Sequence, residues 1–251
     1  MNHWLRKNLD IANKYLNLYK VEELPSVDII VMTYRVKCID RLINSINCQV
    51  VKPNKVIVVT DRYTPNDVDR LKGITNCNEL FIIDNIPTEV ILGERNNIAF
   101  RRTTSEYIAV MDDDDRYYPY YLKSQLSYVK ECPTPAGLSK INPIGFNEDN
   151  GTCGFVLARY RKDLKRAGAG GSLVLHRAIL ERYGFDQIQC GYDSTILFQT
   201  AADPEFTLLG SDPFNFIVTR GRPEGHTWEL KLGGIYRNDV YLKDVELRGK
   251  E

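Results

Sequence analysis

Four consecutive aspartates, Asp112 to Asp115, are the residues of this sequence best suited to chemistry. They follow directly on the apolar run YIAVM at 107–111, which has the composition of a buried strand. Neighbouring carboxylates repel one another, and a fold that gathers them at a strand end usually offsets that repulsion with a cation. Oxygen ligands suit hard ions, so the run predicts an Mg²⁺ or Mn²⁺ site that also receives substrate phosphates. The alternative interpretation is a solvated acidic turn.

A parallel sheet is the element expected to position this acidic run. Short apolar runs rich in β-branched residues stand at 27–32, 55–60, 80–83 and 107–111. Helical patterns separate them, at 36–48, from Pro65 onward and at 94–104. Strands that are apolar on both faces and alternate with helices predict an α/β fold. Its central sheet is mostly parallel and Rossmann-like, with flanking helices.

Polar residues stand where three of these strands end. Ligands of such sheets bind beyond the C-terminal strand ends. The polar residues at those positions are Thr33, Tyr34 and Arg35 after the first strand, Asp61 after the second, and the four aspartates after the fourth. The pattern therefore predicts one site that all three ends share.

The second half of the chain is less regular. We expect helices at 119–130, 177–183 and 192–202, strands at 155–160 and 173–176, a loop at 132–154 and a mobile tail from 221. The N-terminal segment 1–24 is expected to form an amphipathic helix that packs on the domain. Residues 25–251 are expected to form a single catalytic domain. Its nucleotide-binding half covers 25–120 and its acceptor-binding half covers 121–251.

Composition limits the class of protein. The 251 residues contain 33 acidic and 33 basic side chains, which does not favour a protein that grips long stretches of nucleic acid. No window is apolar over the roughly 18 residues that a membrane span needs. The six cysteines are scattered without metal-ligand spacing, and the N-terminus has no signal-peptide core. Together these features favour a cytoplasmic protein without a structural zinc site.

The order of these segments resembles a family 2 glycosyltransferase of the GT-A fold. The resemblance covers roughly residues 27–200, and four segments between residues 29 and 119 carry it. They are IIVMTYR at 29–35, VIVVTD ending at Asp61, GERN at 93–96, and MDDDD at 111–115 with Pro119 a few residues on. The usual asparagine after Thr33-Tyr34 is missing, and Arg35 stands in its place.

The resemblance implies a role for each residue that matches the family pattern. Asp61 would contact the nucleobase, Asp112 would lie near the ribose or base, and Asp114 would be the main metal ligand. Asp115 would be a supporting acid, and Arg95 would meet the diphosphate. The remaining residues assigned to nucleotide-sugar binding are Thr33, Tyr34, Arg35, Asp113 and Gly171, the last from a small-residue segment at 167–171.

The same resemblance implies a general base and a second metal ligand. In the family the base stands in an acidic pair at a helix start, and Asp193 matches that position. Tyr192 replaces the acid that usually precedes it, and Asp186 is the alternative base. His226 would be a late metal ligand. Without these roles, Asp193 is a helix cap, Arg95 a surface ion-pair partner and His226 a structural histidine.

The sequence as a whole predicts a metal-dependent glycosyltransferase. It would transfer a sugar with inversion from a nucleotide-sugar, expected to be a UDP-sugar, to an acceptor hydroxyl. The acceptor stays open among a saccharide, a protein and a modified DNA base. Nucleotidyl transfer is an alternative, disfavoured because residues 33–37 contain no glycine. A non-catalytic nucleotide- or glycan-binding module is a second alternative, and Tyr192 is the feature that supports it.

Overall fold

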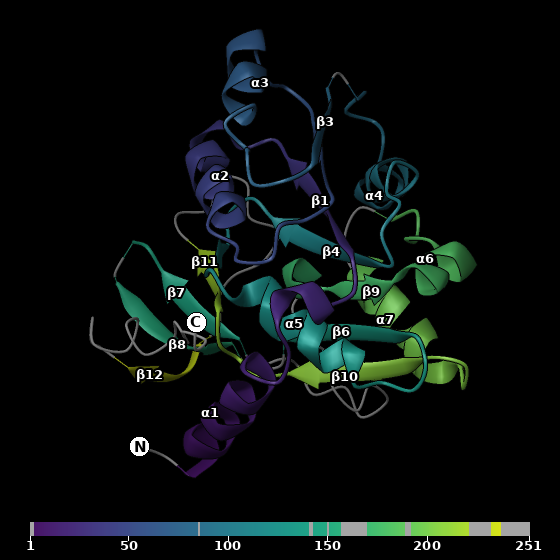
Figure 1. Ribbon diagram of the computed structural model, residues 1–251. Coiled ribbons are helices and arrows are strands. Elements are labelled where there is room, and N and C mark those ends of the chain that lie inside the picture. Colours follow the sequence, from purple (N-terminus) through teal and green to yellow (C-terminus); the bar gives the residue numbers. More distant parts are fainter. Residues whose placement is uncertain are drawn as a thin grey trace.

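The computed structural model describes residues 3–84, 86–140, 143–149, 151–156, 170–188, 192–220 and 232–236. Helices cover a large central sheet on both faces, and a smaller sheet lies beside it (Figure 1). The helices are α1 (His3–Leu16), α2 (Ile39–Asn47), α3 (Pro65–Leu71), α4 (Leu92–Phe100), α5 (Tyr121–Lys130), α6 (Arg177–Tyr183) and α7 (Tyr192–Ala202). Single 3-10 turns are η1 (Val21–Glu23), η2 (Val36–Cys38) and η3 (Gly170–Ser172).

The central sheet has seven strands in the order β10-β6-β9-β4-β1-β2-β3. Its strands are β1 (Val27–Thr33), β2 (Lys55–Thr60), β3 (Glu79–Ile83), β4 (Tyr107–Asp112), β6 (Ala136–Lys140), β9 (Val174–His176) and β10 (Thr207–Ser211). All its neighbouring pairs are parallel except those that β9 makes with β4 and β6. The predicted mostly parallel α/β sheet with flanking helices is therefore confirmed.

Alternate residues of the central strands face two separate hydrophobic cores, because side chains of a strand point in turn to opposite faces. Ile29 and Val31 pack with α2, α3 and α5, whereas Ile30 packs with α4, α6 and α7. Burial of both faces explains why these strands read as continuous apolar runs in the sequence. It also fixes the sheet rigidly beneath the loops that follow its strands.

The C-terminal ends of β1, β2 and β4 lie next to one another. Thr33 pairs in register with Thr60, and Met32 pairs with Asp112. The residues that follow these ends are therefore brought to one edge of the sheet, as the sequence predicts.

The predicted loop at 132–154 is wrong. Most of it forms strands: β6 joins the central sheet, while β7 (Ile144–Asn147) and β8 (Thr152–Val156) pair in the smaller sheet. That sheet has the order β12-β8-β7-β11-β5 and includes β5 (Arg116–Tyr117), β11 (Phe216–Arg220) and β12 (Leu232–Tyr236). The tail pattern from residue 221 predicts no strand, yet β12 lies there and pairs with β8. The structure describes the predicted strand at 155–160 only as far as residue 156, the end of β8.

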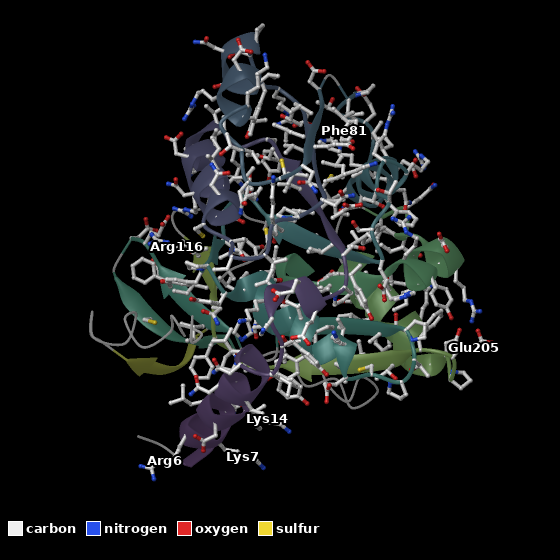
Figure 2. The ribbon with its side chains drawn as sticks, viewed as in Figure 1. Arg6, Lys7, Lys14, Phe81, Arg116 and Glu205 are labelled. Atoms are coloured by element: carbon white, nitrogen blue, oxygen red, sulfur yellow. The ribbon has the colours of Figure 1, made fainter. Side chains whose placement is uncertain are left out.

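Helix α1 packs against α5 through its apolar side. Ala12 and Leu16 are buried with Phe214, and the Tyr15 ring stacks on Tyr128 with centroids 3.8 Å apart. The exposed side of α1 carries basic residues, and Figure 2 shows Arg6, Lys7 and Lys14 extending away from the protein. Within the described part of the chain, every helix is too short or too polar to span a bilayer.

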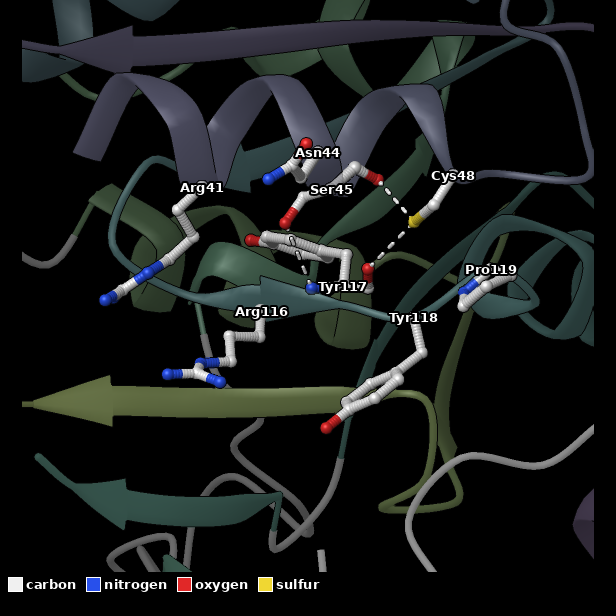
Figure 3. A pocket seen from close by; sticks show the side chains of 8 residues that line it. All are labelled: Arg41, Asn44, Ser45, Cys48, Arg116, Tyr117, Tyr118 and Pro119. Carbon is white, nitrogen blue, oxygen red and sulfur yellow. Dashed lines mark hydrogen bonds between the residues drawn. The ribbon is translucent and has the colours of Figure 1, made fainter. Parts of the chain in front are cut away.

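An open groove of about 490 Å³ runs between α2 and β5 (Figure 3). Its lining residues are Arg41, Asn44, Ser45, Cys48, Arg116, Tyr117, Tyr118 and Pro119.

Candidate active site

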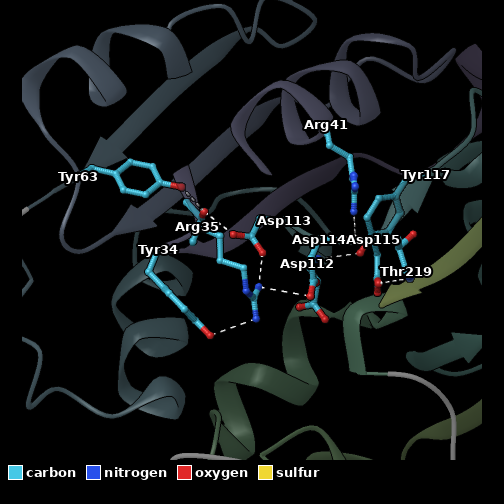
Figure 4. A network of polar contacts seen from close by, with 11 residues as sticks. Tyr34, Arg35, Arg41, Tyr63, Asp112, Asp113, Asp114, Asp115, Tyr117 and Thr219 are labelled. Carbon is cyan, nitrogen blue, oxygen red and sulfur yellow. Dashed lines mark hydrogen bonds and ion pairs between the residues drawn. The ribbon is translucent and has the colours of Figure 1, made fainter. Parts of the chain in front are cut away.

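Three of the four aspartates converge after β4. Asp112, Asp114 and Asp115 each place a carboxylate oxygen within 4.8 Å of those of the other two. Asp114 and Asp115 are buried, and the Oδ1 atom of Asp115 accepts a hydrogen bond of 2.9 Å from the Thr219 amide of β11 (Figure 4). An all-oxygen set of three acidic ligands fits a hard divalent cation.

Asp113 is turned toward β1 instead. Its Oδ2 atom accepts a 2.6 Å hydrogen bond from the Thr33 hydroxyl, and its Oδ1 atom pairs with the Arg35 guanidinium. Burial raises the pKa of the Asp113 carboxyl, and the charge of Arg35 acts against that shift. Arg35 also lies 3.5 Å from Asp114 Oδ2. One arginine therefore balances part of the negative charge that the acidic turn concentrates.

An aromatic pair borders the β1 side of the turn. The Arg35 guanidinium lies 4.6 Å from the centre of the Tyr34 ring and donates a 3.1 Å hydrogen bond to its hydroxyl. The Tyr63 hydroxyl lies 2.6 Å from Thr33 Oγ1, and burial raises the pKa of Tyr63. Tyr63 was not among the predicted site residues; its position two residues after Asp61 was the available signal.

Asp61 and Arg95 form a buried ion pair, with 2.7 Å between Oδ2 and Nη1. Arg95 also donates from Nε to the Val90 carbonyl at 2.7 Å. The Oδ1 atom of Asp61 is buried and has no hydrogen-bond partner among the described residues. A buried carboxylate oxygen without a donor costs free energy that a ligand N–H or O–H can recover. In this structure, Arg95 contacts Asp61 and nearby main-chain carbonyls.

Two adjacent glycines separate the acidic turn from the predicted base. A Cβ on Gly171 would lie 2.6 Å from Asp112 Oδ2, and a Cβ on Gly170 would lie 2.6 Å from Asp193 Oδ2. Both carboxylates thus press against the backbone of η3, which only glycine permits. The Tyr117 hydroxyl locks η3 to β4 because it accepts from the Asp112 amide at 2.7 Å and donates to the Gly171 carbonyl at 2.5 Å.

Asp193 lies in the first turn of α7 and is largely buried, which raises the pKa of its carboxyl. Backbone N–H groups of Ser194 and of Asp193 itself act against that shift. Asp186, the alternative base, has its carbonyl against Gly93 at the start of α4. His226, the predicted late metal ligand, lies outside the described residues.

A match to a known protein family shows which class of protein contains this group of residues. The family described as Glycosyl transferase family 2 matches residues 28–184, more than half of the chain. The chain belongs to glycosyl transferase family 2. The matched segment of this family 2 glycosyltransferase runs from β1 to the end of α6 and contains the acidic turn. The predicted family and enzyme class are thereby confirmed.

Solved glycosyltransferase structures share the fold. S. aureus TarS 1–349 in complex with UDP-GlcNAc superposes with a TM-score of 0.61 at 21% identity, over 80% of this chain and 60% of that chain. The mannosyltransferase PcManGT from Pyrobaculum calidifontis, in complex with GDP-Man and Mn²⁺, superposes with a TM-score of 0.60 at 17% identity, over 86% and 64%. The family 2 chain described here thus spans less than two thirds of the length of these structures. A search of the curated proteins finds no match. The predicted GT-A fold is confirmed.

Proposed function

We propose that this family 2 glycosyltransferase binds a UDP-sugar with Mn²⁺ or Mg²⁺ and transfers the sugar, with inversion, to an acceptor hydroxyl. The observation that carries the proposal is the convergence of Asp112, Asp114 and Asp115 within 4.8 Å at the end of β4. That end lies beside β1, and β1 lies beside β2, the strand that leads to Asp61. Nucleoside and metal functions would therefore share one edge of the sheet.

The acidic turn would hold the metal through Asp114, with Asp112 and Asp115 at its sides and His226 as a further ligand. A bound divalent cation supplies charge that stabilises the diphosphate as it leaves the sugar. Asp113 would act through its partners, because both of its oxygens are engaged by Thr33 and Arg35. It would hold the turn against β1 and keep Arg35 in place beside Asp114.

The nucleoside would lie on the β1 and β2 side of the turn. Asp61 Oδ1 is buried and accepts no hydrogen bond from the part of the chain that the structure describes, so an imide N–H of uracil would satisfy it. Arg95 orients that carboxylate through its 2.7 Å ion pair. Tyr34 and Tyr63 supply aromatic surface on the same side. Thr33 and Gly171 would border the bound nucleotide-sugar.

Asp193 would take the proton of the acceptor hydroxyl as that oxygen attacks the sugar. Its carboxylate lies against Gly170, next to the residue that contacts Asp112. A base beside the metal-binding turn is in position to act on the sugar of a metal-bound donor. Burial raises the pKa of Asp193, and a more basic carboxylate is the better proton acceptor.

Residues 25–251 would form one catalytic domain, with a nucleotide half over 25–120 and an acceptor half over 121–251. The segment from residue 221 would close over the bound donor, and the enzyme would act in the cytoplasm. The two solved structures named above were obtained with UDP-GlcNAc and with GDP-Man and Mn²⁺. The first question to settle by experiment is therefore whether the donor nucleotide carries uridine or guanosine.

Calorimetry with nucleotides tests this proposal. UDP, GDP, CDP and TDP are titrated with and without Mn²⁺ into wild type, Asp114→Asn and Asp69→Asn. Asp69 is an exposed residue of α3 that pairs with Lys72, so its variant is a matched control. We expect UDP to bind only with Mn²⁺ and Asp114→Asn to weaken it by at least about tenfold. Absence of nucleotide binding to wild type, or equal binding by both variants, would overturn the proposal.

A further inference from the structure

Two arginines from opposite walls of the α2–β5 groove converge on one oxygen atom. Arg41 of α2 and Arg116 of β5 lie 2.5 Å and 3.2 Å from Glu148 Oε1. Figure 3 shows both guanidinium groups extending toward the same end of the groove. Two guanidinium groups that meet at a single anionic oxygen form the arrangement by which proteins recognise phosphate.

Glu148 can vacate this position more easily than the arginines can. It lies in the turn after β7, and its side chain is 34% exposed. Arg41 is anchored from the other side, because its Nη1 atom donates a 2.6 Å hydrogen bond to the Asp114 carbonyl. Arg116 lies over the Phe146 ring at 5.7 Å. Among the described residues, the charged side chains at this end of the groove are Arg41, Arg116 and Glu148, which together leave one positive charge for a ligand.

The rest of the groove can hold the group to which a phosphate is attached. Arg41 and Asn44 of α2 and Cys48, which caps its C-terminal end, line one side of the groove at the spacing that places helix residues above one another. Asn44 offers an exposed amide, and Tyr118 and Pro119 form part of the opposite wall. The volume of about 490 Å³ exceeds what one phosphate needs.

The position of the groove relative to the acidic turn indicates which substrate would enter it. In Figure 4, Tyr34, Arg35 and Tyr63 lie on one side of the aspartates, and Arg41 and Tyr117 lie on the other. Tyr117 lines the groove and also bonds to Gly171, the neighbour of the glycine that contacts Asp193. The groove therefore adjoins the acidic turn on the side away from the proposed nucleoside site, and the hydrogen bond of Tyr117 to Gly171 links its wall to η3, the turn that contacts the proposed base.

We propose that the Arg41–Arg116 groove binds a phosphate group carried by the acceptor, and that Glu148 occupies the phosphate position until the acceptor enters. This inference rests on the proposed function, because it specifies the acceptor class of the same site. Two convergent guanidinium groups bind an anionic phosphate more strongly than the neutral hydroxyls of a saccharide, because their hydrogen bonds to an anion are charge-assisted. They would hold a phosphorylated acceptor in one orientation and present its hydroxyl to Asp193.

The first experiment titrates inorganic phosphate into enzyme saturated with UDP and Mg²⁺, which fill the donor site. Binding is followed by the ¹⁵N–¹H signals of the arginine Nε groups. We expect Arg116→Gln to weaken phosphate binding by at least about tenfold, because one charge-assisted contact is lost. Glu148→Gln should tighten it by about three- to tenfold, because a competing carboxylate is neutralised. The control is Arg101→Gln, an exposed arginine of similar kind that pairs with Glu94.

A structural ion pair would give the opposite pattern and overturn the proposal. In that case phosphate would not bind, or Arg116→Gln and Arg101→Gln would bind it equally. UDP binding with Mg²⁺ is measured in the same samples. If UDP binds normally while phosphate does not, the inference alone has failed. If UDP does not bind, the proposed function has failed, and the phosphate titration of the free enzyme still reports on the groove.

A second experiment separates an acceptor-borne phosphate from a free phosphate effector. Transfer is assayed with phosphorylated saccharides and with the same saccharides lacking phosphate. An acceptor site predicts a preference of at least about tenfold for the phosphorylated saccharides, which Arg116→Gln abolishes. It also predicts that free phosphate competes with the acceptor and leaves slow hydrolysis of the donor unchanged. A change in donor hydrolysis without competition would identify a free effector and overturn the acceptor assignment.

Discussion

Asp193 and the acidic turn differ in whether a cationic side chain lies beside their carboxylates. Arg35 pairs with Asp113 and lies near Asp114, whereas the carboxylate of Asp193 lies against the backbone of Gly170. Burial raises the pKa of Asp193 above the ordinary value of an aspartate. An aspartate of this kind loses more of its ionised form at mildly acidic pH than a solvated one does.

This shift predicts the acidic limb of the pH profile. A general base must be ionised, so kcat/KM should fall as the pH falls through the raised pKa of Asp193, at a higher pH than for an ordinary aspartate. Asp193→Asn should lower kcat/KM by about 100-fold or more and remove this limb. The measurement is kcat/KM from pH 4 to 9, roughly the span over which carboxylates and histidines titrate. Asp186→Asn is the control, and a loss of the limb in that variant instead would move the base to Asp186.

The raised pKa of Asp193 also makes the stability of the folded protein depend on pH. A carboxyl whose pKa is higher in the folded state favours folding while it is protonated, and that contribution is lost as the pH rises through the folded pKa. The ionised form of Asp193 therefore lowers the stability of the folded wild type at neutral pH. In the variant Asp193→Asn the free energy of unfolding at pH 7 should be equal to or higher than that of wild type, while its activity falls.

At the level of single residues, the sequence could predict which side chains gather but not which way each points. Asp112, Asp114 and Asp115 converge on one another, and Gly171 lies against Asp112. Asp113 turns to Thr33 and Arg35, because successive residues of a turn face different directions and tertiary partners select among them. The sequence showed that Arg35 replaces the usual asparagine. Only the structure shows that the Arg35 guanidinium pairs with Asp113 and lies near Asp114.

Among the elements, η3 is the one that contacts both Asp112 of the acidic turn and Asp193, the proposed base. Its three residues lie between the turn after β4 and the start of α7, and its glycines touch Asp112 and Asp193. Tyr117 fixes its distance from β4 through two hydrogen bonds. A methyl group added at this point displaces a functional side chain and leaves the core unchanged.

Gly171→Ala should therefore lower activity more than stability. Its Cβ would lie 2.6 Å from Asp112 Oδ2, so that carboxylate must move. A displacement of about 1 Å costs up to about 100-fold in rate. Mn²⁺ affinity by calorimetry and transfer rate should both fall, with the urea midpoint close to wild type. Gly73→Ala is the control, because its Cβ would meet the Arg70 carbonyl at 3.1 Å, remote in sequence from the acidic turn and η3. Unchanged Mn²⁺ affinity in Gly171→Ala would contradict this account of η3.

Elements with strong apolar runs were predictable, and short strands between turn residues were not. The runs at 27–32, 55–60 and 107–111 became β1, β2 and β4 because both of their faces are buried. The segment AGLSK at 136–140 is equally buried, yet it contains a lysine, a serine and a glycine. Lys140 is tolerated because it lies 3.3 Å from the buried Asp212 carboxylate. A partner 72 residues away cannot be identified from local pattern.

On the scale of the whole molecule, one sheet crosses the two predicted halves. Strands β6, β9 and β10 come from the acceptor half, yet β9 pairs directly with β4 of the nucleotide half. The candidate site is divided in the same way, since Asp61 and the acidic turn come from the first half and Asp193 from the second. A ligand that binds the site should therefore stabilise the sheet as one cooperative unit.

Thermal unfolding with UDP and Mn²⁺ tests this coupling. At a free UDP concentration of about 100 times Kd, binding adds about 2.7 kcal/mol to the free energy of unfolding. For a domain of this size each kcal/mol raises Tm by about 2–4 °C, so a single transition should move upward by about 5–10 °C. Calorimetric scans of Asp114→Asn under the same conditions should show no such rise, because the proposed UDP site requires the metal that Asp114 would hold. Two transitions, of which UDP moves only one, would mean that the halves unfold separately and that the shared sheet does not transmit the stabilisation.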